Sequence, residues 1–238
     1  MDIYTILAAM AIIFVGATVQ FTIGFGLAIV AAPWLFLLNE DYVPAPIIMM
    51  ALIISSITCY QYRENLSFKG LWSAIVGRIP GSLLGAWFLV HFHTEALSLW
   101  LGAIVIFAVA VSYSPFRLEP NQFRMGIAGF LSGFMGTTSS IGGPPMALLL
   151  QHQKAEYLRA NLSAFFVFSC VMSLLVLAPI GHLNFTHLKL AAPLLPAVLL
   201  GAWVGRRFAS RIPREQVRTL TMLVCFISGV SSIIAYFI

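Results

Sequence analysis

Long apolar stretches separated by short polar connections make up almost the whole chain. The apolar segments cover residues 3–38, 43–60, 70–90, 96–113, 125–150, 160–178, 188–205 and 219–238. None alternates apolar and polar residues over a long run, and most approach the roughly 20 residues that a membrane-spanning helix needs. The pattern predicts helices that cross a bilayer. Because no linker is long enough to separate soluble domains, residues 1–238 are expected to form a single transmembrane domain.

The composition supports an all-α polytopic membrane protein. Of the 238 residues, 60% are hydrophobic and only 9% are charged, against about 25% charged residues in a soluble domain. This excludes a soluble enzyme and a nucleic-acid-binding module, and makes membrane lipids the expected surroundings. The cysteines, Cys59, Cys170 and Cys225, lie far apart and have no metal-binding spacing. We therefore expect no metal and no cofactor.

The chain contains an internal repeat. Residues 80–87, Pro-Gly-Ser-Leu-Leu-Gly-Ala-Trp, and residues 196–203, Pro-Ala-Val-Leu-Leu-Gly-Ala-Trp, are identical at six of eight positions. Upstream, Gly24 and Pro33 are nine residues apart, as are Gly136 and Pro145. Two halves, of about 5–113 and 125–236, therefore share one pattern, which is typical of secondary transporters.

The basic residues predict how the chain sits in the membrane, because cytoplasmic loops are rich in lysine and arginine. If the first segment of each half enters and leaves on the same side, eleven of the thirteen basic residues share one face. These are Arg63, Lys69, Arg117, Arg124, Lys154, Arg159, Arg206, Arg207, Arg211, Arg214 and Arg218. The halves are then expected to be inverted repeats, each with a broken hairpin and about three spanning helices. We expect an inner-membrane protein with both termini outside.

Both hairpins are expected to turn at residues that break helices. The first break is at Gly24-Phe25-Gly26, and the second lies within residues 136–145, Gly-Thr-Thr-Ser-Ser-Ile-Gly-Gly-Pro-Pro. Flanking helices over 125–135 and 145–151 would be too short to cross a core about 30 Å thick. The second break is therefore expected near the bilayer centre, where irregular backbone must line a cavity or be buried in protein. The first hairpin is either re-entrant or two full crossings.

A helix that restarts inside a cavity directs free N–H groups and a positive dipole end into it, which suits an anion. The candidate contacts are Gly24 and Gly26 in the first break, and Gly136, Thr137, Thr138, Ser139, Ser140, Gly142 and Gly143 in the second. The alternative is that these glycines only permit close packing of helices.

Arg78 is a further candidate, because it lies inside the apolar segment 70–90. A charged arginine near the bilayer centre costs about 2.5–3.5 kcal/mol, and no acidic residue lies at a comparable depth in the sequence. An external anion is the natural partner, since guanidinium groups match oxyanions. The alternative is that Arg78 extends to the inner headgroups.

Several other polar residues have two possible roles. Gln20 and Thr22 precede the first break, where they either line a cavity or bond between helices. Arg159 and Asn161 begin a helix beside the second hairpin, and Arg159 is either a substrate contact or an anchor at the inner surface. Four histidines map to outer loops, either as a metal or proton-sensing cluster or as ordinary interfacial residues: His91, His93, His182 and His187.

Two stretches carry a resemblance to a known family. They are residues 24–33, Gly-Phe-Gly-Leu-Ala-Ile-Val-Ala-Ala-Pro, and residues 132–145, Ser-Gly-Phe-Met-Gly-Thr-Thr-Ser-Ser-Ile-Gly-Gly-Pro-Pro. There, and in its duplicated layout and length, the chain resembles the sulfite exporter TauE/SafE family. The resemblance implies a permease for sulfur-containing anions such as sulfite, sulfonates or sulfoacetate.

The expected function is therefore secondary transport, in the direction of export, of small sulfur-containing anions by alternating access around a midplane site. A proton-coupled uptake permease, and a membrane partner or assembly factor without transport, are the alternatives. An enzyme is not expected, because no histidine lies at membrane depth to activate Ser139 or Ser140 as a nucleophile.

Overall fold

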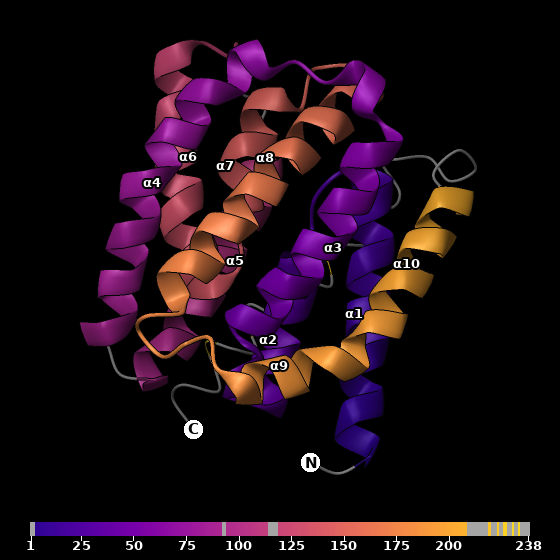
Figure 1. Ribbon diagram of the computed structural model, residues 1–238, viewed down its shortest axis with the longest axis vertical. Helices are drawn as coiled ribbons and strands as arrows, with labels where there is room; N and C mark the ends of the chain where they lie inside the picture. Colours follow the sequence, from indigo (N-terminus) through magenta and orange to yellow (C-terminus); the bar gives the residue numbers. More distant parts are fainter. Residues whose placement is uncertain are drawn as a thin grey trace.

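The computed structural model describes residues 3–91, 94–113 and 119–208, together with six single positions between 219 and 233. These residues form helices and connecting turns, with no strand among them (Figure 1). Five stretches in the described part are long and apolar enough to cross a membrane: Ile3–Ile23, Glu40–Gln61, Gly70–His91, Ala155–Leu177 and Phe185–Arg207. The all-α polytopic fold is confirmed. The expected last span, 219–238, lies outside the described residues except at those single positions.

The first hairpin breaks where the sequence predicts. Helix α1 (Ile3–Ile23) ends at the first glycine, and helix α2 (Leu27–Leu38) begins after the second. Gly24 and Gly26 have φ values of 106° and 123°, which residues with a side chain rarely adopt. The reversal of the chain therefore depends on glycine at both positions. The short 3-10 helix η1 (Glu40–Tyr42) follows α2.

The second hairpin breaks later than the sequence predicts. Helix α6 (Gln122–Ser139) continues through residues 136–139, and helix α7 (Gly143–Leu150) begins after a turn at 140–142. The expectation of a flanking helix limited to 125–135 was wrong. At about 1.5 Å per residue, the 18 residues of α6 reach roughly 27 Å. A midplane position of this break remains a prediction.

Six further α-helices and two 3-10 helices complete the list of elements in the described residues. They are α3 (Ala45–Gln61), η2 (Arg63–Asn65), α4 (Phe68–His91), α5 (Thr94–Tyr113), α8 (Ala155–Leu177), α9 (Phe185–Ala191), η3 (Ala192–Leu194) and α10 (Leu195–Phe208). The apolar segment expected at 188–205 is thus divided. Pro193, within η3, lacks an N–H group, so the regular α-helical bonding is interrupted there.

The helices pair in a way that relates the two halves of the sequence. The most extensive contacts are α4 with α6, α1 with α10, and α3 with α8. Glycines 77, 81 and 85 of α4 face the carbonyl groups of residues 126, 130 and 134 of α6 in the same order, so these helices run parallel. Gly201 and Gly205 of α10 pack likewise along residues 14–21 of α1. Each half thus packs its helix with the repeated Leu-Leu-Gly-Ala-Trp sequence on the first helix of the other. Inverted repeats would give this arrangement, and the inversion stays a prediction.

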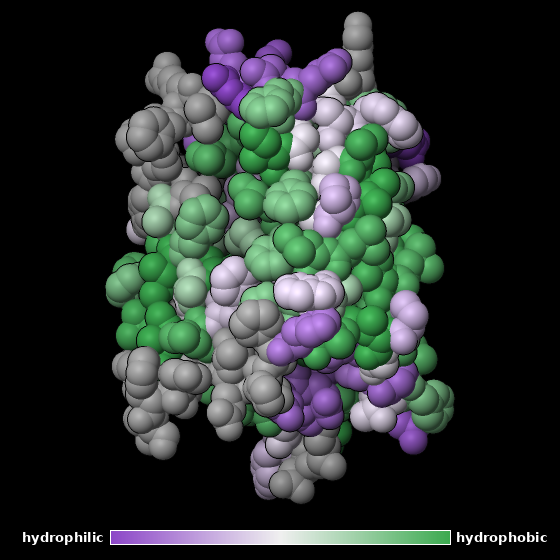
Figure 2. Space-filling model, turned by 90° about the vertical axis from the view of Figure 1, so that its left-hand side faces the viewer, coloured by the Kyte–Doolittle hydropathy of each residue, from purple (hydrophilic) through white to green (hydrophobic). Residues whose placement is uncertain are grey.

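The outer surface is apolar around the middle of the molecule. Figure 2 shows a broad hydrophobic band with hydrophilic residues toward both ends. Large side chains such as Trp72, Trp87 and Trp203 are more than half exposed. A surface of this kind is what lipid covers in a polytopic membrane protein.

Candidate functional site

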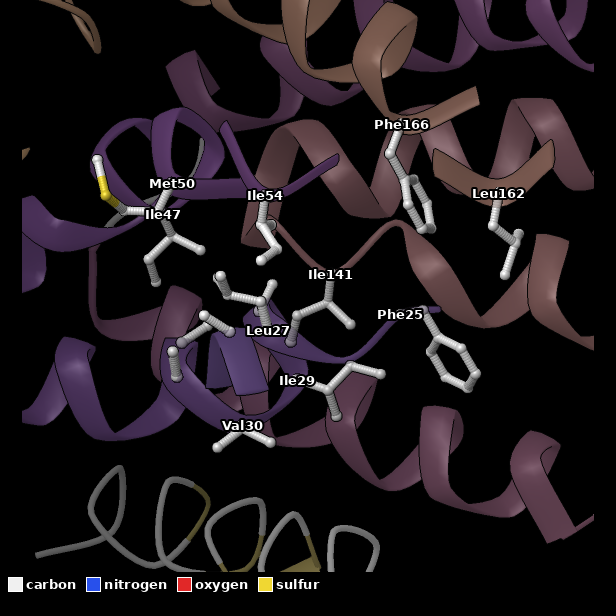
Figure 3. Packing of buried hydrophobic residues seen from close by; sticks show 14 of the residues in the cluster. Phe25, Leu27, Ile29, Val30, Ile47, Met50, Ile54, Ile141, Leu162 and Phe166 are labelled. Carbon is white, nitrogen blue, oxygen red and sulfur yellow. The ribbon is translucent and has the colours of Figure 1, made fainter. Parts of the chain in front are cut away.

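The two breaks meet at one small cavity. Its lining includes Gly26, Ala28 and Ile29 from the first break and the start of α2, and residues 140–143 from the second break. Side chains of α3, α4 and α8 close the remaining sides, and the cavity has a volume of about 40 Å³. Figure 3 shows Ile141 of the second break beside Ile29 and Leu27 of α2. Two segments more than a hundred residues apart in sequence therefore form one pocket.

Arg78 provides the cavity with a buried cation. It lies in the middle of α4 and is 3% exposed. Its Nη1 donates to Ser132 Oγ at 3.0 Å, and its Nη2 donates to Ser173 Oγ at 2.9 Å and to the Ser169 carbonyl at 3.2 Å. The guanidinium carbon also lies 5.7 Å from the centre of the Phe165 ring. The side chain is thus held in the interior between α6 and α8.

The guanidinium has unused hydrogen-bonding capacity. Its Nε is buried and has no hydrogen-bond partner among the described residues. All its partners are neutral hydroxyl or carbonyl groups, and no carboxylate in the described chain pairs with it. A buried arginine usually has a counter-ion, because an unpaired buried charge is costly. The positive charge of Arg78 is therefore not balanced by any carboxylate among the described residues.

Close helix packing places this guanidinium. Gly77 and Gly81, on either side of Arg78 in sequence, lie against the backbone of α6. The side chain of Arg78 then reaches Gly136, where an added Cβ would lie 2.9 Å from Nη2. The glycines at 77, 81 and 136 therefore do permit close packing, and this packing makes room for the cation.

Ser132 couples the cation to the second break. Its Oγ accepts from Arg78 and donates to the carbonyl of Gly142 at 2.5 Å. Gly142 itself packs against Ser132, because an added Cβ would lie 2.8 Å from the Ser132 carbonyl oxygen. Two hydrogen bonds in sequence therefore link Arg78 to the turn between α6 and α7.

Gln20 organises the first break. Its Oε1 accepts from the N–H of Leu27 at 3.2 Å, and its Nε2 donates to Ser55 Oγ of α3 at 3.1 Å. Gln20 therefore lines the cavity and also bonds to a neighbouring helix, so both roles that the sequence left open are present. The next two N–H groups of α2, of Ala28 and Ile29, have no acceptor within the described residues. Both residues line the cavity.

Helix α7 offers few backbone donors at its start. Its first turn contains Pro144 and Pro145, which have no N–H group. Only Gly143 remains as a donor within its first three positions. The expectation that α7 directs free N–H groups toward an anion stays a prediction, with Gly143 as its donor at these positions.

The four hydroxyl residues at 137–140 have different hydrogen-bond partners. Thr138 and Ser139 donate to backbone carbonyls of their own helix. Thr137 pairs with Ser173 Oγ at 2.9 Å. Ser140, with φ at 66°, donates to the Pro44 carbonyl at 2.9 Å. Of these four, only Ser140 lines the cavity.

Arg159 belongs to a second cluster, away from the cavity lining. Its Nε donates to the Thr22 carbonyl at 3.1 Å, and its Nη1 donates to the Tyr62 hydroxyl at 3.2 Å. A cation there complements the negative C-terminal end of α1. Gly24 belongs to the same cluster, since an added Cβ would meet Leu158 and Arg159. The Thr22 hydroxyl bonds to Thr18 within α1.

Asn161 lies in a third place. Its Oδ1 accepts from the N–H of Ser67 at 2.9 Å, and its Nδ2 donates to the Asn65 carbonyl at 3.1 Å. It therefore fastens α8 to the connection between α3 and α4. The structure brings neither Asn161 nor Arg159 to the cavity, and a role for them in substrate binding stays a prediction.

Sequence reasoning missed the three serines around Arg78. Ser132, Ser169 and Ser173 are each at most 1% exposed. The one signal available was the spacing of 169 and 173, which places two small polar residues on one face of an apolar helix.

Comparison with known proteins identifies the family. The family model of the sulfite exporter TauE/SafE matches residues 8–232. The chain belongs to the sulfite exporter TauE/SafE family. The resemblance noted in the sequence is thereby confirmed, and the protein is a multi-pass membrane transporter of this family.

Two relatives of the chain are named in the comparison. A probable membrane transporter protein, YunE of Bacillus subtilis, is 27% identical over 88% of this chain and 89% of its own length. A probable sulfite/organosulfonate exporter, TauE of Cupriavidus necator, is 22% identical over 85% of this chain and 84% of its own length. No solved structure matches the chain significantly.

Proposed function

We propose that this TauE/SafE protein exports small sulfur-containing anions, such as sulfite or organosulfonates, by alternating access around the cavity at Arg78. The observation that carries the proposal is a 3% exposed arginine whose partners are all neutral. The printed name of the Cupriavidus relative supports the substrate class.

The electrostatics of the cavity favour an anion. A charged arginine deep in a membrane protein costs about 2.5–3.5 kcal/mol on insertion scales. The three oxygens around Arg78 hold the guanidinium in place, but they carry no net charge. An oxyanion in the cavity would meet the free Nε–H and neutralise the charge, which repays part of that cost.

The start of α2 adds a second set of donors. The N–H groups of Ala28 and Ile29 have no acceptor among the described residues, and both residues line the cavity at the positive end of a 12-residue helix. Backbone donors of this kind suit oxyanions because they add no side chain that must be ordered. An anion between Arg78 and the start of α2 would therefore be bound by two different helices, α4 and α2.

The size of the cavity suits a small substrate. About 40 Å³ is room for roughly three water molecules, if each needs at least about 10–15 Å³. Three oxygens of a compact oxyanion such as sulfite would replace them. The apolar wall of Phe25, Ile29 and Phe166 would exclude bulk water around the charge.

The direction of transport follows from charge. An inside-negative potential favours the exit of an anion by about 2.3 kcal/mol per charge per 100 mV. Export therefore needs no coupling ion. In the described part of the chain, the acidic residues lie in connections or at helix ends rather than at the depth of Arg78, which leaves no carboxylate placed as a proton relay.

The proposal is tested by anion flux in proteoliposomes that contain the purified protein. Vesicles loaded with sulfite should release it severalfold faster than protein-free vesicles, and an inside-negative potential should accelerate release. Loading with a carboxylate of similar size gives the control for general leakage. Release at the protein-free rate for sulfite, sulfoacetate and taurine alike would contradict the proposed function.

A further inference from the structure

Two apolar grooves flank the first half of α6 on the outer surface. The first runs between α6, α7 and α5, has a volume of about 210 Å³, and has Ile127, Leu131 and Leu148 among its lining residues. The second, of about 370 Å³, lies on the neighbouring side of α6, and its described lining belongs to α6 alone, with Phe123, Ile127 and Phe130 among it. Ile127 lines both and forms the ridge between them.

Both grooves begin at the same polar end of α6. Gln122 lines the second groove and Arg124 lines the first. From Arg124 to Leu131 the first groove follows α6 for seven residues, which is about 10 Å. Each groove therefore has a polar mouth at the helix start and an apolar floor that extends toward the middle of the molecule.

Arg124 is available to a ligand at this mouth. It is exposed, and its Nη1 donates to the Glu119 carbonyl at 3.0 Å. No carboxylate in the described residues pairs with it. Asn121 caps the helix by accepting from the N–H of Arg124. The mouth therefore has a positive side chain beside the positive end of a helix.

We propose that this surface of α6 binds one anionic diacyl phospholipid of the surrounding bilayer. The head phosphate would lie at Arg124, and the two acyl chains would occupy the two grooves on either side of Ile127. Two grooves that share a ridge and a charged mouth match a two-chained amphiphile. A single-chained ligand would fill only one of them.

The site is distinct from the cavity at Arg78, but it contacts the same hairpin. Pro145 and Leu149 of α7 are buried residues that line the first groove, and α7 begins directly after the second break. A bound lipid would therefore stabilise the packing of α7 on α6. The proposal does not depend on which anion the protein transports.

The test is lipid binding by the full-length protein in detergent, measured by native mass spectrometry and by the thermal shift on lipid addition. Phosphatidylglycerol should bind more tightly, and raise the melting temperature more, than phosphatidylcholine with the same acyl chains. Arg124→Gln should weaken phosphatidylglycerol binding about fivefold, from about 1 kcal/mol per basic residue, and leave phosphatidylcholine binding unchanged. Arg207→Gln is the matched control, because Arg207 is an exposed arginine over Trp203 on α10.

A second pair of variants tests the grooves themselves. Ile127→Trp enlarges the ridge and should reduce binding of both lipids, whereas Leu199→Trp, at a 52% exposed site on α10, should not. Equal affinity of wild-type protein for the two lipids, or an Arg124→Gln variant that keeps full phosphatidylglycerol binding, would overturn the proposal. So would stabilisation by soluble glycerol phosphate as strong as by the lipid. A dimer that Ile127→Trp dissociates would assign the surface to a second copy of the chain instead.

Discussion

The guanidinium of Arg78 lies against the backbone of Gly136, so that an added Cβ at residue 136 would be 2.9 Å from Nη2. The nearest atom is the end of a side chain, which can move, and the nearest backbone atom, the Cα of Gly142, lies 3.3 Å from the added Cβ and needs to shift only slightly. Gly136→Ala should therefore lower sulfite affinity about tenfold, or about 1.4 kcal/mol, with little change in melting temperature. The measurement is sulfite titration of the purified protein. Gly70→Ala is the control, because nothing lies within 4 Å of the new Cβ; equal affinity of both variants would contradict this account of Gly136.

Ser173 holds the same guanidinium from the side of α8. Ser173→Ala removes an oxygen that accepts from Nη2 and pairs with Thr137. A hydrogen bond to a charged group contributes about 1.5–3 kcal/mol, so sulfite flux in proteoliposomes should fall by roughly tenfold or more. Ser56→Ala provides the comparison, since exposed Ser56 bonds only to Leu52 of its own helix. Unchanged flux in Ser173→Ala would show that Arg78 does not need this support.

Arg159 is expected to stabilise the fold through the end of α1. Arg159→Met removes its hydrogen bonds to the Thr22 carbonyl and to Tyr62, which should cost about 1.5–3 kcal/mol. A thermal melt of the detergent-purified protein measures the loss. Arg63→Met is the matched variant, because Arg63 is exposed and stacks on Tyr60 at 4.6 Å. Equal melting temperatures of Arg159→Met and Arg63→Met would contradict a stabilising role of Arg159 at the end of α1.

His182, in the connection between α8 and α9, predicts a loss of stability in acid. Burial lowers the pKa of His182, and nearby His187 lowers it further, although Asp41 opposes the shift. Its stabilising contribution is complete above about pH 6.5, the unfolded value, and is lost as pH falls through the lower folded pKa. The melting temperature of His182→Gln should therefore depend less on pH between 7.5 and 5 than that of wild type. His152→Gln, at an exposed histidine, should keep the wild-type dependence; a His182→Gln curve parallel to wild type would refute the assignment.

The sequence was sufficient for features that depend on local chemistry or on the apolar pattern. It predicted apolar membrane helices, a break at Gly24-Phe25-Gly26, and Arg78 as a cation within an apolar helix, and the structure adds that both glycines have positive φ. It misplaced the end of α6, because Thr138 and Ser139 look like turn residues. In the structure their hydroxyls bond carbonyls one turn back, which keeps them compatible with the helix.

The partners of Arg78 could not be predicted in the same way. Ser132 and Ser173 lie 54 and 95 positions away in sequence. A serine in an apolar helix commonly bonds to its own backbone, so its residue type alone gives no sign of a distant contact. The contact depends on the glycine-lined packing of α4 on α6 and on where α8 crosses them, and these are properties of the tertiary fold.

The most direct test compares sulfite binding and sulfite flux in Arg78→Gln, Arg78→Lys and wild-type protein. Glutamine removes the charge at similar reach, whereas lysine keeps the charge but loses the planar fork. Arg207→Gln on α10 controls for the loss of any exposed positive charge, and gel filtration shows whether each variant is folded. We predict that folded Arg78→Gln neither binds nor releases sulfite above the protein-free background, and that Arg78→Lys keeps a reduced activity. Wild-type affinity and flux in folded Arg78→Gln would contradict an anion site at this arginine.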